Sequence, residues 1–288
     1  AVLRRYAMYM ARLVFGFLMG MARLPQNLHP FGLAAICSFS EAKSVLFTYA
    51  GVALSCLFAG NGALSDFILY FLLYVGRKAF TESKFSEPLY ARVLESAAVS
   101  MAIGVIRICA GRSEPIYEYV AFLSLSAVSC AFTVFFSTLF TEKFNAKSKL
   151  STRSICLYAL MGALVCSFRG ITFSGFDVQI IAACIITLVF AAANGFMHAG
   201  IVGFVCGIAC FSPWASAALG LAGITAAFLF SKGIFTAIAA FCGVFWVCGA
   251  YGAGLAEAVR VLPSVLCAGV LFVPACGVMP ELVRLNAP

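Results

Sequence analysis

The chain has 288 residues, of which 63% are hydrophobic and only 10% are Asp, Glu, Lys or Arg. A water-soluble domain of this length could not cover such a composition with a polar surface, so that class of protein is excluded. The apolar runs are continuous rather than alternating, which favours spanning helices over barrel strands. We therefore expect an all-α, polytopic transmembrane helix bundle whose main partner is the lipid bilayer.

Apolar segments follow one another along the whole chain. A helix needs roughly 20 apolar residues to cross the hydrocarbon core. The segments 29–40 and 196–211 are too short to do so comfortably, and we expect them to be re-entrant or tilted within the protein. The pattern predicts ten to twelve segments in a single multi-span membrane domain over residues 1–288. The apolar segments lie near residues 6–22, 29–40, 44–60, 63–76, 91–110, 118–140, 154–171, 176–193, 196–211, 213–231, 234–251 and 257–274.

The distribution of Lys and Arg predicts the orientation, because basic residues favour cytoplasmic loops. If the N-terminus lies inside and the segments alternate, the basic loops 77–92 and 141–153 fall on the inner side, and both termini are cytoplasmic. The net charge of +8 belongs to this topology, so no nucleic-acid partner is needed to explain it. The basic residues that fall on the outer side are few: Arg23, Arg112, Arg169 and Arg260.

Residues that could carry chemistry are scarce. The only histidines are His29 and His198, and the only aspartates are Asp66 and Asp177. The sequence contains none of the short patterns typical of zinc proteases, nucleophile elbows or phosphate-binding loops. We therefore predict no catalytic residue, no cofactor site and no metal ligand in this chain, and we interpret His198 as a headgroup-level histidine.

A charged residue inside an apolar segment is a functional candidate by default. Arg107 is the clearest case and is our predicted intramembrane charge. It lies near the outer end of its segment, so its guanidinium can also reach the interface along its own stem. Glu95 follows Arg92 by three residues, and we expect these two to form a pair on one helix surface.

Small residues recur at a spacing of four. Gly16 and Gly20 form one such pair, and Ala199, Gly203 and Gly207 repeat the spacing twice. This spacing places small residues on one face of a helix, where two backbones can approach closely in lipid. We predict that these five residues lie at helix–helix contacts. Packing within one chain is favoured, and a homo-oligomer face is the alternative.

Two stretches of the chain are similar to a known family. The first is RLPQNLHPFGLA at residues 23–34. The second covers residues 194–284 and contains, in order, GIVGFVCG, LGLAGI, FSKGIFTA and LFVP. The order and spacing of these motifs resemble the N-terminal membrane domain of stage II sporulation protein E from endospore-forming bacteria.

In that family, the membrane domain precedes a cytoplasmic regulatory region and a manganese-dependent serine/threonine phosphatase of the 2C type. The phosphatase acts on an anti-anti-sigma factor and so activates the forespore sigma factor. The family also meets the tubulin-like division protein at the polar septum. The resemblance implies a multi-pass anchor of the bacterial cytoplasmic membrane, with the phosphatase domain outside these 288 residues and no enzyme activity in this chain.

A small-molecule transporter or channel is the alternative function. Its support is the multi-span architecture, the short segments 29–40 and 196–211, and Arg107, because interrupted helices can build sites near the midplane. The absence of paired intramembrane charges and of a clear internal repeat speaks against it. An intramembrane enzyme is disfavoured because the sequence offers no catalytic constellation.

Overall fold

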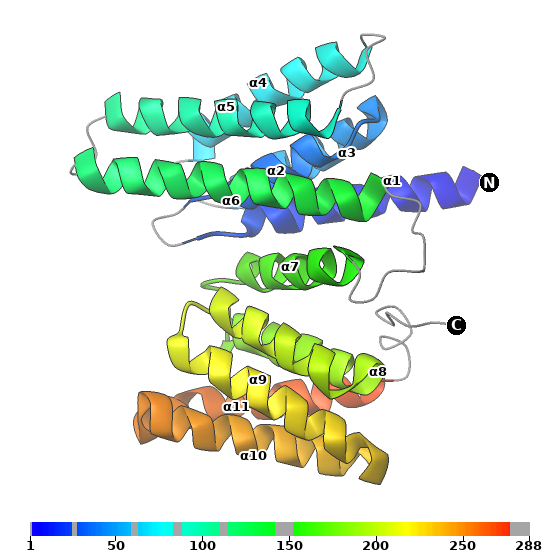
Figure 1. Cartoon of the computed structure of the whole chain (residues 1–288), viewed down its shortest axis with the longest axis vertical. Helices are drawn as coiled ribbons and strands as arrows, with labels where there is room; N and C mark the ends of the chain where they lie inside the picture. The colour runs from blue at the N-terminus through cyan, green and yellow to red at the C-terminus, as the bar shows by residue number, and fades with distance from the viewer. Residues whose placement is uncertain are drawn as a thin grey trace. The chain divides into compact units, whose positions relative to one another are not determined.

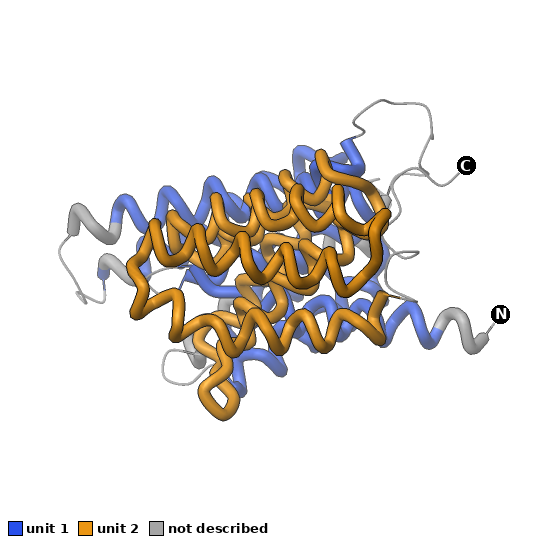
Figure 2. The backbone as a smooth tube through the Cα atoms, turned by 90° about the horizontal axis from the view of Figure 1, so that it is seen from below, with its two compact units in different colours: residues 1–156 blue, residues 157–288 orange. Residues whose placement is uncertain are grey.

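The computed structural model describes residues 2–24, 28–58, 63–82, 88–109, 115–141 and 152–276. These parts are all-α apart from one short β-hairpin (Figure 1), as the sequence predicts. Six of the described helices are long and apolar enough to cross a membrane. The chain divides into two compact units, residues 1–156 and 157–288 (Figure 2).

Unit 1 is built around a short central helix. That helix, α2, is contacted by every other helix of the unit. The long helices α5 and α6 run antiparallel, because Ser100 near the middle of α5 meets Ser129 of α6 while Arg92 near the start of α5 meets Ser137 near the end of α6. The helices of unit 1 are α1 (Val2–Met21), α2 (Pro30–Ser38), α3 (Ala42–Phe58), α4 (Ala63–Glu82), α5 (Leu89–Cys109) and α6 (Pro115–Thr141).

Glycines of α1 permit a close contact with α3. A Cβ atom at Gly16 would overlap the carbonyl oxygen of Thr48, and one at Gly20 would overlap the hydroxyl of Ser55. The sequence-predicted pair Gly16 and Gly20 therefore lies where α1 and α3 approach at backbone distance. Such an approach gives dense van der Waals packing, which is a main source of helix association in lipid.

Unit 2 is a series of antiparallel helices with a hairpin at its start. The hairpin pairs Thr172 with Asp177 and turns through Gly175, whose φ of +82° suits glycine. The sequence analysis did not anticipate it. The elements of unit 2 are α7 (Thr152–Ser167), β1 (Thr172–Phe173), β2 (Phe176–Asp177), α8 (Val178–Ala209), α9 (Pro213–Leu229), the 3₁₀ turn η2 (Phe230–Lys232), α10 (Ile234–Ala253) and α11 (Leu255–Ala275).

Helix α8 is interrupted at Gly195, which has non-helical angles of φ 80° and ψ −174°. The chain folds back there, because the side chain of Gln179 at the start of α8 donates to the carbonyl of Ala209 at its end, at 2.9 Å. The two segments, 178–194 and 196–209, are about 25 Å and about 21 Å long at 1.5 Å per residue. This agrees with the sequence analysis, which separated the apolar segments 176–193 and 196–211.

The second segment of α8 packs tightly on α9. A Cβ atom at Gly203 would overlap the carbonyl oxygen of Leu219, and one at Gly207 would overlap the backbone of Ser216. Ala199 is fully buried. The structure therefore places the stripe Ala199, Gly203 and Gly207 against α9 of the same chain.

We predict that Gly203→Leu destabilises the protein, because the new side chain would have to displace the backbone of α9. The expected loss is about 1–3 kcal/mol of unfolding free energy. Thermal unfolding in detergent measures it, together with the size of the solubilised particle. Gly243→Leu is the matched control, since no atom lies within 4 Å of a Cβ at Gly243. Equal stability of the two variants would contradict the close contact between α8 and α9.

Candidate functional site

The most distinctive site is the buried helix α2 of unit 1. Pro30 occupies its first turn, where the missing N–H costs least, and the other residues are apolar or small. All nine of its residues are buried. At 1.5 Å per residue the helix is about 14 Å long, less than half of the hydrocarbon core. Both of its ends therefore lie inside the protein, and the backbone groups at these ends need partners there.

The N-terminal end of α2 is held by α1 and α4. The hydroxyl of Tyr70 donates to the carbonyl of His29 at 3.2 Å, and the His29 ring lies 3.2 Å from the carbonyl of Gly20 through Nδ1. The ring of Phe31 packs edge to face on Phe132 of α6, with centroids 4.7 Å apart. These contacts fix the entry of the chain into the half-helix.

The C-terminal end of α2 is held by two arginines. Arg92 donates to the carbonyl of Ser38 at 2.8 Å, and Arg77 donates to the carbonyl of Phe39 at 2.5 Å. The hydroxyl of Ser137 also donates to Ser38 at 3.3 Å. A helix C-terminus carries partial negative charge, so positive side chains there are favourable, most of all where water is excluded.

The arginine charges are deeply buried, and Glu95 compensates one of them. The Arg77 side chain is 0% exposed, and its Nη1 lies 3.0 Å from a carboxylate oxygen of Glu95, which is 19% exposed. The sequence analysis assigned Glu95 to Arg92 on the same helix. In the structure the ion pair of Glu95 with Arg77 joins α5 to α4, whereas the guanidinium of Arg92 donates to the carbonyl of Ser38 at the end of α2.

A second ion pair lies just beyond the end of α2. Arg12 of α1 is 2.9 Å from Glu41, which stands between α2 and α3. The pKa of Glu41 is lowered, chiefly by the hydrogen bond from Ser44 and further by Tyr9 and Arg12, against the opposing effect of burial. Glu41 therefore stays ionised at neutral pH and keeps its ion pair with Arg12 of α1.

Two further candidates from the sequence are Arg107 and His198. The side chain of Arg107 is outside the described residues. His198 bonds through Nδ1 to the hydroxyl of Tyr158, which ties α8 to α7. Among the described residues, no group of three or more His, Cys, Asp or Glu side chains is placed to hold a metal ion.

A small polar cavity of about 150 Å³ lies at one end of unit 2. Its charged side chains have structural partners. Asp177 caps α8 by accepting from the backbone N–H groups of Gln179 and Ile180, at 2.9 Å and 3.3 Å. Glu257 lies 3.5 Å from Arg260, one turn further along α11.

No protein-family model, no curated protein and no solved structure matches this chain. The resemblance of residues 23–34 and 194–284 to a known family therefore stays a prediction from the sequence motifs.

We predict that Glu95→Gln destabilises the protein strongly, because it removes the carboxylate that forms an ion pair with the fully buried Arg77. Removing one partner of a buried pair typically costs about 3–5 kcal/mol. Unfolding by a denaturing detergent measures the loss. The control is Glu257→Gln, whose pair with Arg260 is exposed and should cost less than about 1 kcal/mol. Similar losses for the two variants would refute a special role for the buried pair.

Proposed function

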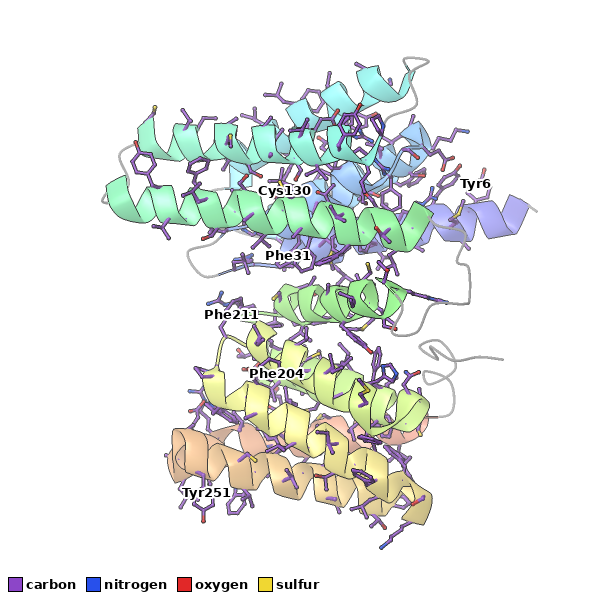
Figure 3. The ribbon with its side chains drawn as sticks, viewed as in Figure 1. Tyr6, Phe31, Cys130, Phe204, Phe211 and Tyr251 are labelled. Atoms are coloured by element: carbon purple, nitrogen blue, oxygen red, sulfur yellow. The ribbon has the colours of Figure 1, made fainter. Side chains whose placement is uncertain are left out.

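We propose that this chain is a multi-pass membrane module that anchors and localises a protein phosphatase resembling stage II sporulation protein E. The observation that carries the membrane part is the apolar outer surface of the helices. The side chain of Tyr251 projects outward near the end of α10 (Figure 3) and is 90% exposed, and Phe204 of α8 is exposed as well. Large apolar side chains in such positions need lipid as their solvent.

The same kind of surface occurs in both units. Large apolar side chains on α3, α4, α5, α6, α9, α10 and α11 are strongly exposed. Helices that present apolar residues to the outside as well as the inside are typical of membrane spans. The exposed residues include Leu57, Phe58, Leu72, Leu94, Leu123, Phe228, Phe235 and Val270.

We further propose ten or twelve crossings with both termini in the cytoplasm. In unit 2 the helices alternate in direction, so Arg153 and Lys232 lie at one end and Arg169 and Arg260 at the other. The basic segment 141–153 leads into α7 in the sequence, so we assign it to the first end. Because positive charge favours the cytoplasmic side, that end is assigned to the cytoplasm.

The sporulation role is proposed from the sequence resemblance. It assigns the chain to the bacterial cytoplasmic membrane and to the polar septum, with the tubulin-like division protein as a partner. The attached phosphatase would activate the forespore sigma factor, and this chain would supply its position. If the module forms a homo-oligomer, its contact face is separate from the small-residue stripe at Gly203, because α9 covers that stripe.

A small-molecule transporter or channel is the second candidate, and one observation favours it. The half-helix α2 ends inside unit 1, as the interrupted helices of many transporters do. In addition, a row of buried hydroxyl groups lies between α5 and α6 and leads to the C-terminal end of α2. The row contains Ser96, Ser100, Ser129, Thr133 and Ser137.

We predict opposite membrane sides for Lys232 and Phe173, which lie at opposite ends of unit 2 and are both exposed. An impermeant thiol reagent should label Phe173→Cys in intact cells, and should label Lys232→Cys only after the membrane is permeabilised. The chain has thirteen cysteines, so labelling is measured as the increase over the unmodified chain. Labelling of Lys232→Cys in intact cells would reverse the assigned orientation.

The localisation function predicts where a reporter will go. A fluorescent protein fused to the C-terminus of the chain, expressed in a sporulating endospore-forming bacterium, should stay with washed membranes and concentrate at the polar septum. An unrelated multi-pass protein with the same reporter is the control. Uniform fluorescence around the membrane, together with ion conductance of the purified chain in planar bilayers, would favour the channel instead.

A further inference from the structure

A groove opens between α4 and α5 on the outside of unit 1. Its volume is about 260 Å³, and it is lined by Leu72, Gly76 and Arg77 of α4 and by Glu95, Ala98 and Ala102 of α5, among others. The space exists because the facing residues are small: no atom lies within 4 Å of a Cβ built at Gly76. The two helices are therefore close enough to hold a narrow ligand but do not fill the gap themselves.

The rim of the groove is apolar and outward facing. Leu72, which lines the groove, is 58% exposed, and Val75 of α4 and Leu94 and Met101 of α5 are exposed elsewhere on the same two helices. Helix α5 is one of the helices that can cross a membrane. Because lipid is the solvent of such a surface, the groove opens towards the hydrocarbon of the bilayer.

One end of the groove is charged. Arg77 and Glu95, which both line the groove, form their 3.0 Å ion pair there, and the Glu95 side chain is 19% exposed. Arg77 stands five residues before the end of α4 at Glu82, which is about 8 Å along the helix axis. The groove thus begins near a helix end, where lipid headgroups lie, and continues inwards along apolar walls.

We propose that this groove binds an acyl chain of a bilayer phospholipid, which excludes water from the Arg77–Glu95 pair. Apart from the Arg77–Glu95 pair at one end, the side chains that line the groove are apolar, so a methylene chain matches the lining along its length. Since a lower local dielectric strengthens an ion pair, the bound chain stabilises the clamp on the end of α2.

The substitution Gly76→Leu tests the proposal, because its side chain enters the open groove and takes the place of the lipid. Gly243→Leu is the matched control: it makes the same change at an open glycine of α10, away from the groove. The full chain is purified, stripped of lipid, and supplied with phosphatidylglycerol or phosphatidylcholine carrying identical acyl chains. Thermal unfolding and native mass spectrometry then report stability and bound lipid.

We expect both lipids to raise the Tm of the wild type and of Gly243→Leu by roughly 2–4 °C, with a retained lipid adduct. Gly76→Leu should lose most of this rise and most of the adduct. An equal rise in Gly76→Leu overturns the proposal. So does a rise with phosphatidylglycerol only, which would assign binding to the headgroup, or a loss of oligomer size in Gly76→Leu, which would assign the groove to a second copy. If Gly76→Leu does not fold, Ala102→Leu on the exposed side of α5 provides the same test with the same outcomes.

Discussion

The backbone carbonyls at the end of α2 impose the constraint on which unit 1 depends. A helix that stops inside lipid-embedded protein leaves its last carbonyls without helical partners, and no bulk water is present to replace them. Arg77 and Arg92 supply the missing donors. Their burial in turn requires a counter-charge, and Glu95 provides one across the α4–α5 interface. The short helix α2 thus explains why charged side chains are buried in a unit whose apolar surroundings would otherwise disfavour them.

In unit 2 the helices are held by close backbone packing and by helix capping instead of by buried charged side chains. The second segment of α8 reaches α9 at Gly203 and Gly207, where the absence of side chains lets the backbones touch. Asp177 satisfies the first N–H groups of α8 at the end of the unit. Van der Waals contact and helix capping need no desolvated ions, so unit 2 is stabilised by attractions that the bilayer weakens little.

The helical segments could be predicted from the sequence, but the contacts between charged residues that are far apart in the sequence could not. The apolar runs located the short helix α2 and the break near Gly195, and the four-residue spacing located the contacts of Gly203. Arg77 was assigned to a cytoplasmic loop because Lys78 and Glu82 follow it, whereas α4 continues through all three. Its pairing with Glu95 depends on how α4 meets α5, which no local pattern encodes.

The arginine cluster also bears on the choice between anchor and transporter. A transport site needs polar groups that can exchange their partners for a substrate and release it again. Arg77 and Arg92 instead donate to backbone carbonyls, which cannot move away without exposing the end of α2. A ligand that displaced these carbonyls from the two arginines would have to replace the hydrogen bonds of several buried polar groups at once. The geometry therefore favours a fixed half-helix that shapes the bundle, which is compatible with the membrane anchor that we propose.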